Sequence, residues 1–221
     1  MQRKITKQNN FYYMTAALVV LLLSASLVKS VADGMLETFL EGTIAATFLV
    51  CVVSLGIDKS WKRFMQALIV VWLIAAVLKR YTDIAHIDLL MLGLMFAFFW
   101  GTFSSIARQI LFSGAVNGNK IVGSIALFLL LGLMWALVYL LISALSPNAF
   151  TGVEQSAWGQ NFSQMAYFSF VTLTTLGYGD ISPNTPFAQV AVYMEAIAGV
   201  FYMAIVVASL VSAGLAQKET Q

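Results

Sequence analysis

The chain reads Thr172-Leu173-Thr174-Thr175-Leu176-Gly177-Tyr178-Gly179-Asp180 between two long apolar segments, and this stretch decides its fold. A cation that leaves water must be wrapped by oxygens, and main-chain carbonyls replace the water shell when they all point to one side. An ordinary strand points successive carbonyls to opposite sides. Turning them to one side requires every second residue to adopt a left-handed type of backbone, which costs least at glycine. Gly177 and Gly179 alternate with other residues as that geometry requires, and the Thr175 hydroxyl can add a ring of oxygens at the inner end.

This stretch resembles the pore signature of the potassium channel family, whose selectivity filter reads Thr-Val-Gly-Tyr-Gly. The one departure is Leu176, where valine is usual. The carbonyl of that residue, not its side chain, would face ions, so we expect the change to alter packing behind the filter. The setting is also similar, because a segment rich in Thr, Ser and aromatic residues precedes the stretch and Pro183 follows it. The resemblance implies a filter formed by Thr175, Leu176, Gly177, Tyr178 and Gly179, with K⁺ bound at the first four.

The composition is that of a membrane protein, because 60% of the residues are hydrophobic and only 10% are charged. Six stretches are long enough to cross about 30 Å of hydrocarbon: 11–31, 36–56, 63–80, 87–112, 120–145 and 187–214. The apolar segment Phe162–Leu173 is too short to span and is expected to form a re-entrant helix. We therefore expect an all-α membrane protein of six transmembrane helices, with a pore helix and selectivity filter between the fifth and sixth.

The distribution of basic residues predicts the orientation of the chain. With the amino terminus inside, the outer side holds Lys29, Lys79 and Arg80. The cytoplasmic side holds Arg3, Lys4, Lys7, Lys59, Lys62, Arg63, Arg108, Lys120 and Lys218. Both termini are then cytoplasmic, the filter loop enters from outside, and the expected location is the cell (plasma or inner) membrane.

Four segments are expected along the chain: a sensor-like four-helix domain (1–112), a linker (113–119), a pore domain (120–215) and a short cytoplasmic tail (216–221). Voltage sensing needs several Arg or Lys on the fourth helix, because each charge supplies only about 2.3 kcal/mol per 100 mV. No Arg or Lys occurs from Ile87 to Ala107, so we expect no conventional voltage gating. The tail is too short for a soluble regulatory domain, so gating is expected to come from the membrane part, a partner or the filter.

The pore helix is expected to support the filter. Asn161 or Ser163 can cap its first turn. The resemblance implies that Tyr167 and Phe168 brace the filter by packing against Tyr178, although both could simply fill the core. Thr174 and Asp180, on either side of the filter, are also expected to support it. Some relatives carry a glutamate at the position of Val171 that pairs with the aspartate after the filter, so the hydrogen bonds of Asp180 stay unassigned.

Glu195 is the least expected residue in the chain, because a carboxyl inside a membrane helix is expensive. It lies roughly 14 Å below the outer mouth at 1.5 Å per residue, near the inner end of the filter. We expect it to hydrogen-bond to Thr172 or Thr174, as a carboxylate or a protonated acid, and to support the filter. The alternative is a solvated group without a role in gating.

The sixth helix carries Gly199, 19 residues after Asp180, where relatives have a hinge glycine. Glycine at such a site can equally serve close helix packing. The resemblance further implies an inner cavity that closes by dewetting. Its expected lining is Val200, Met203, Val207 and Val211.

The remaining charged residues suggest structural roles. Glu37 and Glu41 are expected to pair with Lys29, Lys79 or Arg80. His86, with Asp83 and Asp88 nearby, is expected to lie in a solvated loop and not in a metal or pH site. No nucleophile constellation, phosphate-binding loop or nucleic-acid motif occurs in the sequence, so we expect neither an enzyme nor a cofactor other than K⁺ as permeant ion.

The expected function is therefore potassium-selective conduction. One chain supplies one filter strand and an ion cage needs four, so the expected partners are membrane lipid and three further copies of the chain. A non-conducting or modulatory subunit of a heteromeric potassium channel is the alternative, and an additional regulatory subunit is left open.

Overall fold

The computed structural model describes residues 9–29, 34–55, 59–82, 86–111, 118–154, 156–209 and 212. Its elements in chain order are α1 (Asn10–Lys29), α2 (Gly34–Ser54), α3 (Lys59–Tyr81), α4 (Ile87–Leu111), α5 (Gly118–Leu145), β1 (Phe150–Thr151), α6 (Trp158–Leu173), β2 (Ser182–Pro183), α7 (Pro186–Phe201) and the π-helix η1 (Tyr202–Val207). The fold is almost entirely helical, as expected.

The three prolines of the chain mark the boundaries of these elements. Pro147 follows the end of α5, and Pro183 lies in β2. Pro186 begins α7, where its missing N–H costs no hydrogen bond. The Thr185 hydroxyl caps the same helix by accepting from the Ala188 N–H at 3.4 Å. Helix interiors therefore keep their hydrogen-bond ladders intact, which membrane burial requires.

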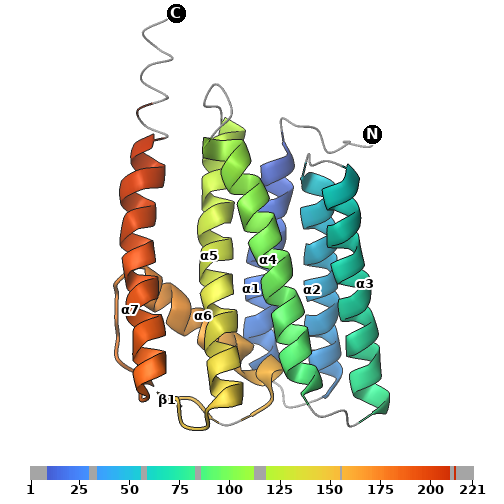
Figure 1. Ribbon diagram of the computed structural model, residues 1–221, viewed down its shortest axis with the longest axis vertical. Helices are drawn as coiled ribbons and strands as arrows, with labels where there is room; N and C mark the ends of the chain where they lie inside the picture. The colour runs from blue at the N-terminus through green and yellow to red at the C-terminus, as the bar shows by residue number, and fades with distance from the viewer. Residues whose placement is uncertain are drawn as a thin grey trace, which may run out of the picture.

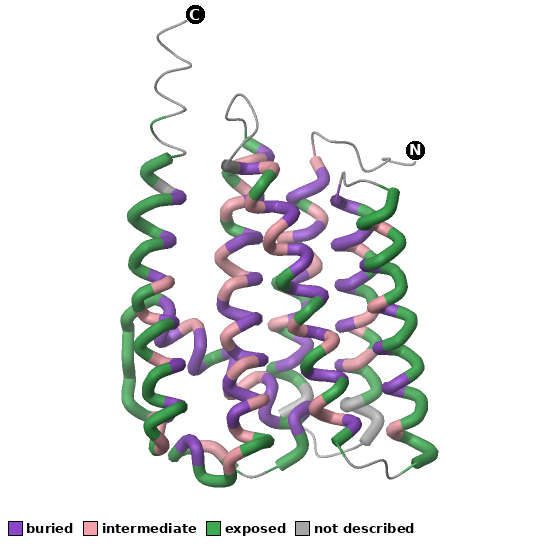
Figure 2. The backbone as a smooth tube through the Cα atoms, viewed as in Figure 1, coloured by how far each residue is buried: buried purple, intermediate pink, exposed green. Residues whose placement is uncertain are grey.

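The long helices stand side by side, while α6 is short and lies obliquely in one half of the bundle (Figure 1). α5 is the centre of the packing, and α1, α4 and α6 all contact it. α1 also packs against α2 and α6. α1 and α4 thus dock directly on α5 of the same chain. α7 lies at the edge of the bundle, and much of its surface is exposed (Figure 2).

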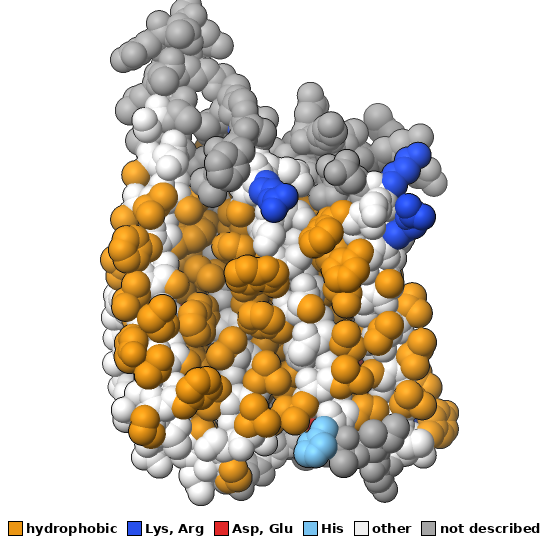
Figure 3. Space-filling view, in the orientation of Figure 1, with side chains coloured by type: hydrophobic (Ala, Val, Ile, Leu, Met, Phe, Trp, Pro, Cys, Tyr) orange, Lys and Arg blue, Asp and Glu red, His pale blue; other side chains and the backbone are white. Residues whose placement is uncertain are grey.

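Among the described residues, five helices are long and apolar enough to cross a membrane: Asn10–Leu27, Lys59–Tyr81, Ile87–Ile110, Gly118–Leu145 and Pro186–Val206. α2 contributes a shorter apolar stretch, Thr38–Ser54. Helices therefore form at all six expected positions. That α2 also crosses the membrane, which would make six crossings, stays a prediction. Figure 3 shows a broad band of hydrophobic side chains with Lys and Arg at one end of this face and His at the other.

Two ion pairs lie at the end of the bundle that carries the α3–α4 connection. Arg80 Nη2 lies 2.8 Å from Glu41 Oε2, which confirms the pairing expected for Glu41. Lys79 Nζ lies 2.8 Å from Asp88 Oδ1. The side chains of Glu37 and Lys29, and all of Asp83, fall outside the described residues. The same holds for most of the expected linker and for the tail, although α5 already begins at Gly118.

Candidate functional site

The segment between α6 and α7 begins with the predicted filter. Gly177 and Gly179 have φ values of +57° and +81°, which confirms the expected left-handed backbone at these alternate positions. Thr175 also lies in this region, with φ +58°, so the alternation extends one step further than predicted. Residues 174–180 are all exposed in the single chain, and Figure 2 shows the segment running along the edge of the molecule.

The last turn of α6 holds the start of this segment. The Thr172 carbonyl accepts from the Thr175 N–H at 2.9 Å. The Val171 carbonyl accepts from the N–H groups of Leu176 and Gly177 at 2.9 and 3.3 Å. The Thr174 hydroxyl donates back to the Phe170 carbonyl at 2.6 Å, so it closes the helix and does not reach Glu195. The position of α6 therefore fixes the position of the segment.

The beginning of α6 differs from the prediction. The helix starts at Trp158, four residues before Phe162, and its N-cap, Ala157, makes no side-chain hydrogen bond. The expectation that Asn161 or Ser163 caps the helix is therefore wrong. The Asn161 amide instead donates to the carbonyls of Glu154 and Ser156 at 2.9 and 3.4 Å, and so orders the loop before the helix.

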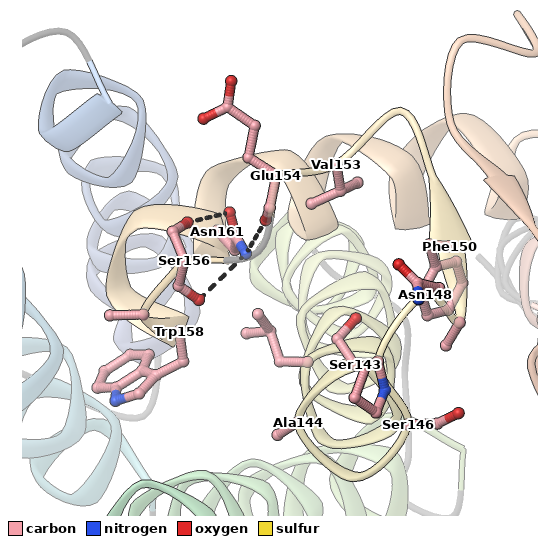
Figure 4. Close-up of a pocket in the computed structure, with 14 residues that line it drawn as sticks. Ser143, Ala144, Ser146, Asn148, Phe150, Val153, Glu154, Ser156, Trp158 and Asn161 are labelled. Atoms are coloured by element: carbon pink, nitrogen blue, oxygen red, sulfur yellow. Dashed lines mark hydrogen bonds between the residues drawn. The ribbon is translucent and has the colours of Figure 1, made fainter.

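A cavity of about 390 Å³ lies at this end of α5, beside the Asn161 hydrogen bonds (Figure 4). The Glu154 carboxylate points away from it, and Trp158 lies at its border (Figure 4). The Trp158 indole donates to Asp88 Oδ1 at 3.1 Å, so the first turn of α6 is tied to α4. Glu154 is the one charged residue among the described residues that line this cavity.

The two aromatic residues of α6 face different surroundings. Phe168 is buried, and its ring packs against Tyr139 at 5.1 Å and Phe150 at 5.7 Å. Tyr167 is 41% exposed, and the interaction of its phenol with Asp180 raises the pKa of Tyr167 above its ordinary value. Tyr167 is therefore a neighbour of Asp180, whose partner the sequence left unassigned. Neither ring packs against Tyr178 among the described ring contacts, so that contact stays a prediction for the assembly.

β1 and β2 join the loops on either side of the pore helix. They pair antiparallel, with Phe150 opposite Pro183 and Thr151 opposite Ser182. Gly152, with φ +82°, lets this loop pass close to Asp180, because an added Cβ would lie 2.0 Å from the Asp180 carbonyl oxygen. The pairing places the chain after the filter against the loop before the pore helix.

Glu195 is fully buried in α7, and its partners differ from those expected. Its Oε1 lies 2.5 Å from Ser169 Oγ, and its Oε2 accepts a hydrogen bond from the Tyr139 hydroxyl. The expectation of a bond to Thr172 or Thr174 is therefore wrong, and so is the alternative of a solvated group. Glu195 lies behind the pore helix, against α5 and α6.

Gly199 packs against the end of the pore helix. A Cβ at this position would lie 2.0 Å from the Leu173 carbonyl oxygen, so the glycine serves the close approach of α7 and α6. Val200 and Met203 follow on α7 and η1 with 57% exposure each. The side chain of Val207 and all of Val211 lie outside the described residues, so nothing is added about them.

Tyr139 and Ser169 were not identified from the sequence as the partners of Glu195. Both are ordinary residues of apolar helices, and no local pattern distinguishes them from core residues. The available signal was the unexplained carboxyl of Glu195, because a buried acid needs polar partners on the neighbouring helices. The Ser169 hydroxyl also lies 2.7 Å from the Gly132 carbonyl oxygen of α5.

Comparison with known proteins identifies the region that contains these features. Residues 125–215 match the family model described as ion channel, and this range includes α6, the predicted filter and α7. No curated protein and no solved structure matches the chain. The apolar helices and the matched segment make the chain a multi-pass membrane protein. The match supports the resemblance to the potassium channel family seen in the sequence: residues 125–215, less than half of the chain, are similar to ion channels.

Proposed function

We propose that the chain is one subunit of a homotetrameric channel that conducts K⁺ passively and selectively through residues 175–179. The observation that carries this proposal is the exposed segment after α6, in which residues 175, 177 and 179 have positive φ. A backbone of this kind turns successive carbonyls toward one side, where K⁺ at Thr175, Leu176, Gly177 and Tyr178 would exchange water for carbonyl oxygens. The similarity of residues 125–215 to the ion channel family supports the same interpretation.

The exposure of the segment supports assembly. Non-helical backbone at membrane depth is tolerated only where protein or a water-filled cavity surrounds it. In the single chain Leu176 and Tyr178 are 56% and 67% exposed, so the segment needs cover that the chain does not supply. A groove of about 640 Å³ lies beside it, lined in part by Tyr167, Leu176 and Leu22 of α1. Four copies around one axis would cover the segment and complete the ion cage.

α7 has two faces that fit this arrangement. Its buried face carries small residues and Glu195: Ala188, Ala191, Glu195 and Gly199. Its exposed face carries large apolar residues at helical spacing: Val190, Tyr193, Met194, Ile197, Val200 and Phe201. We propose that part of the exposed face, with Met203, Val207 and Val211, lines an inner cavity that closes by dewetting.

The outer helices are proposed to be a scaffold and not a voltage sensor. α4 carries Asp88 in its first turn and Arg108 in its last turn, and no basic residue between them. The proposed topology has six crossings, with both termini cytoplasmic and the α3–α4 connection outside. Basic residues on the printed sequence favour this orientation by nine against three.

Flux measurements on purified protein in K⁺-loaded vesicles test the proposal. We expect K⁺ efflux that Ba²⁺ blocks and that exceeds Na⁺ efflux. Gly177→Ala should abolish the selectivity, because alanine rarely adopts a φ of +57°, whereas Gly93→Ala, which has no heavy atom within 4 Å of the added Cβ, should not. Sodium flux equal to potassium flux, or a monomeric protein, would refute the proposal. Silence from a well-folded tetramer would favour the non-conducting subunit instead.

A further inference from the structure

The carboxyl of Glu195 joins three helices at one buried point. Glu195 belongs to α7, Ser169 to α6 and Tyr139 to α5, and α6 contacts both of the other helices. The exposed fraction is 0% for Glu195, Ser169 and Tyr139. The described residues that reach the carboxyl are these two hydroxyls, and neither brings a positive charge. An ionised carboxylate here would be a buried charge without a counter-ion, which is strongly unfavourable.

The number of protons in the network decides the state of the carboxyl. The Ser169 hydroxyl has one proton, yet its oxygen lies within hydrogen-bond distance of two acceptors. These are Glu195 Oε1 at 2.5 Å and the Gly132 carbonyl oxygen at 2.7 Å. If Glu195 were ionised, the single Ser169 proton could serve only one of these two contacts. In the other contact, two oxygen atoms would face each other with no proton between them. A proton on Oε1 resolves this, because Glu195 then donates to Ser169, and Ser169 donates to Gly132. The Tyr139 hydroxyl donates to Oε2, and every polar group is satisfied.

We infer that Glu195 is a neutral carboxylic acid and a positioning residue, which fixes the pore helix between α5 and α7 through this chain of hydrogen bonds. The inference deepens the proposed channel function. It rests on that function only in the experiment that measures ion selectivity. Glu195 touches no ion in this arrangement. It acts through α6.

The route from Glu195 to the filter is short. Ser169 lies two residues before Val171, whose carbonyl holds the N–H groups of Leu176 and Gly177 at 2.9 and 3.3 Å. A shift of α6 at Ser169 therefore moves the acceptor that orients two filter residues. Fixed polar partners of this kind restrict α6 to one position more strongly than apolar contacts, which allow helices to slide.

Close packing keeps water from replacing the network. A Cβ at Gly132 would lie 2.4 Å from the Phe170 ring, so α5 and α6 approach each other closely at the carbonyl that Ser169 reaches. The buried ring of Phe168 packs against Tyr139 on the same side of α6. The hydrogen bonds are thus enclosed by aromatic side chains, and each lost bond would leave a polar group without water.

Infrared spectroscopy tests the protonation directly on the full chain in vesicles at neutral pH. The wild-type spectrum should contain the carbonyl-stretching band of a protonated carboxylic acid, which shifts in D₂O. The band should be absent in Glu195→Gln, displaced in Ser169→Ala, and unchanged in Glu154→Gln, which removes an exposed carboxyl. Absence of the band from the wild type, or its persistence in Glu195→Gln, would overturn the inference.

Two readouts test the positioning role. Glu195→Gln keeps a donor toward Ser169 and an acceptor for Tyr139, so amide exchange at Leu176 and Gly177 should match the wild type. Glu195→Ala and Ser169→Ala should each speed this exchange by about tenfold, the scale of one lost buried hydrogen bond. The K⁺/Na⁺ permeability ratio should fall in the same two variants and recover in Glu195→Gln. Unchanged exchange in both alanine variants would refute the positioning role. If the wild type conducts no ions, the proposed function fails, while exchange and infrared still decide this inference.

Discussion

Replacing Gly199 with alanine should disrupt the contact between α7 and the end of the pore helix. The added Cβ would lie 2.0 Å from the Leu173 carbonyl oxygen, whereas real Cβ atoms essentially never approach within 3.0 Å of a neighbour. α7 and α6 must then separate locally by about 1 Å. The clashing atom belongs to the backbone of α6, so no side-chain rotation can relieve the overlap.

The expected loss of stability follows from two opposing terms. Overpacking a close contact costs about 1 to 3 kcal/mol, and this site belongs at the upper end because the backbone must move. Alanine recovers about 1 kcal/mol relative to glycine through its helix propensity. The net expectation is a decrease of about 2 kcal/mol in the free energy of unfolding. If Gly199 were only a hinge, alanine would stiffen α7 and increase stability.

Thermal stability of the detergent-solubilised protein distinguishes these outcomes. Samples would be heated, and the folded, assembled fraction measured by size-exclusion chromatography. Gly93→Ala and Gly42→Ala are matched controls, since an added Cβ meets nothing within 4 Å at either position. We expect the controls to be as stable as the wild type or slightly more stable, and Gly199→Ala to be clearly less stable. A Gly199→Ala protein as stable as the controls would refute the packing argument.

Three further substitutions test the filter and its surroundings. Gly179→Ala should fold and assemble, because nothing lies within 4 Å of the added Cβ. The φ of +81° strains alanine by about 1 to 2 kcal/mol, so reversal potentials should show reduced K⁺ selectivity. Tyr167→Phe removes the hydroxyl that lies beside Asp180 and should make sustained K⁺ currents decay faster than in the wild type. Arg108→Gln should leave the conductance–voltage relation unchanged, and a steep relation in the wild type would contradict our interpretation of α4.

Backbone conformation was predictable from the sequence at positions where only certain residue types can adopt the required φ and ψ angles. Gly177 and Gly179 were expected in the left-handed region, and both are there. Thr175 could not be predicted in the same way, because a β-branched residue rarely adopts a φ of +58°. Its conformation is imposed by the hydrogen bond from its N–H to Thr172 and by the chain that follows.

Hydrogen-bond partners on neighbouring helices were not predictable from the sequence. The spacing of residues gives the depth of a side chain in the membrane, but it does not give the rotation of its helix about the helix axis. The depth of Glu195 was estimated from the rise per residue, and this suggested Thr172 or Thr174 as partners. The rotation of α7 instead directs the carboxyl toward Ser169 and Tyr139. That rotation depends on which faces of three helices pack together, and here close contact at Gly199 helps to set it.

The pore helix is held at its two ends by different parts of the molecule. Its first turn is tied to the outer helices, because Trp158 donates to Asp88, which also pairs with Lys79 of α3. Its second half is tied to α5 and α7 through Ser169. A displacement of α4 along its axis would therefore reach α6 through Asp88 and Trp158.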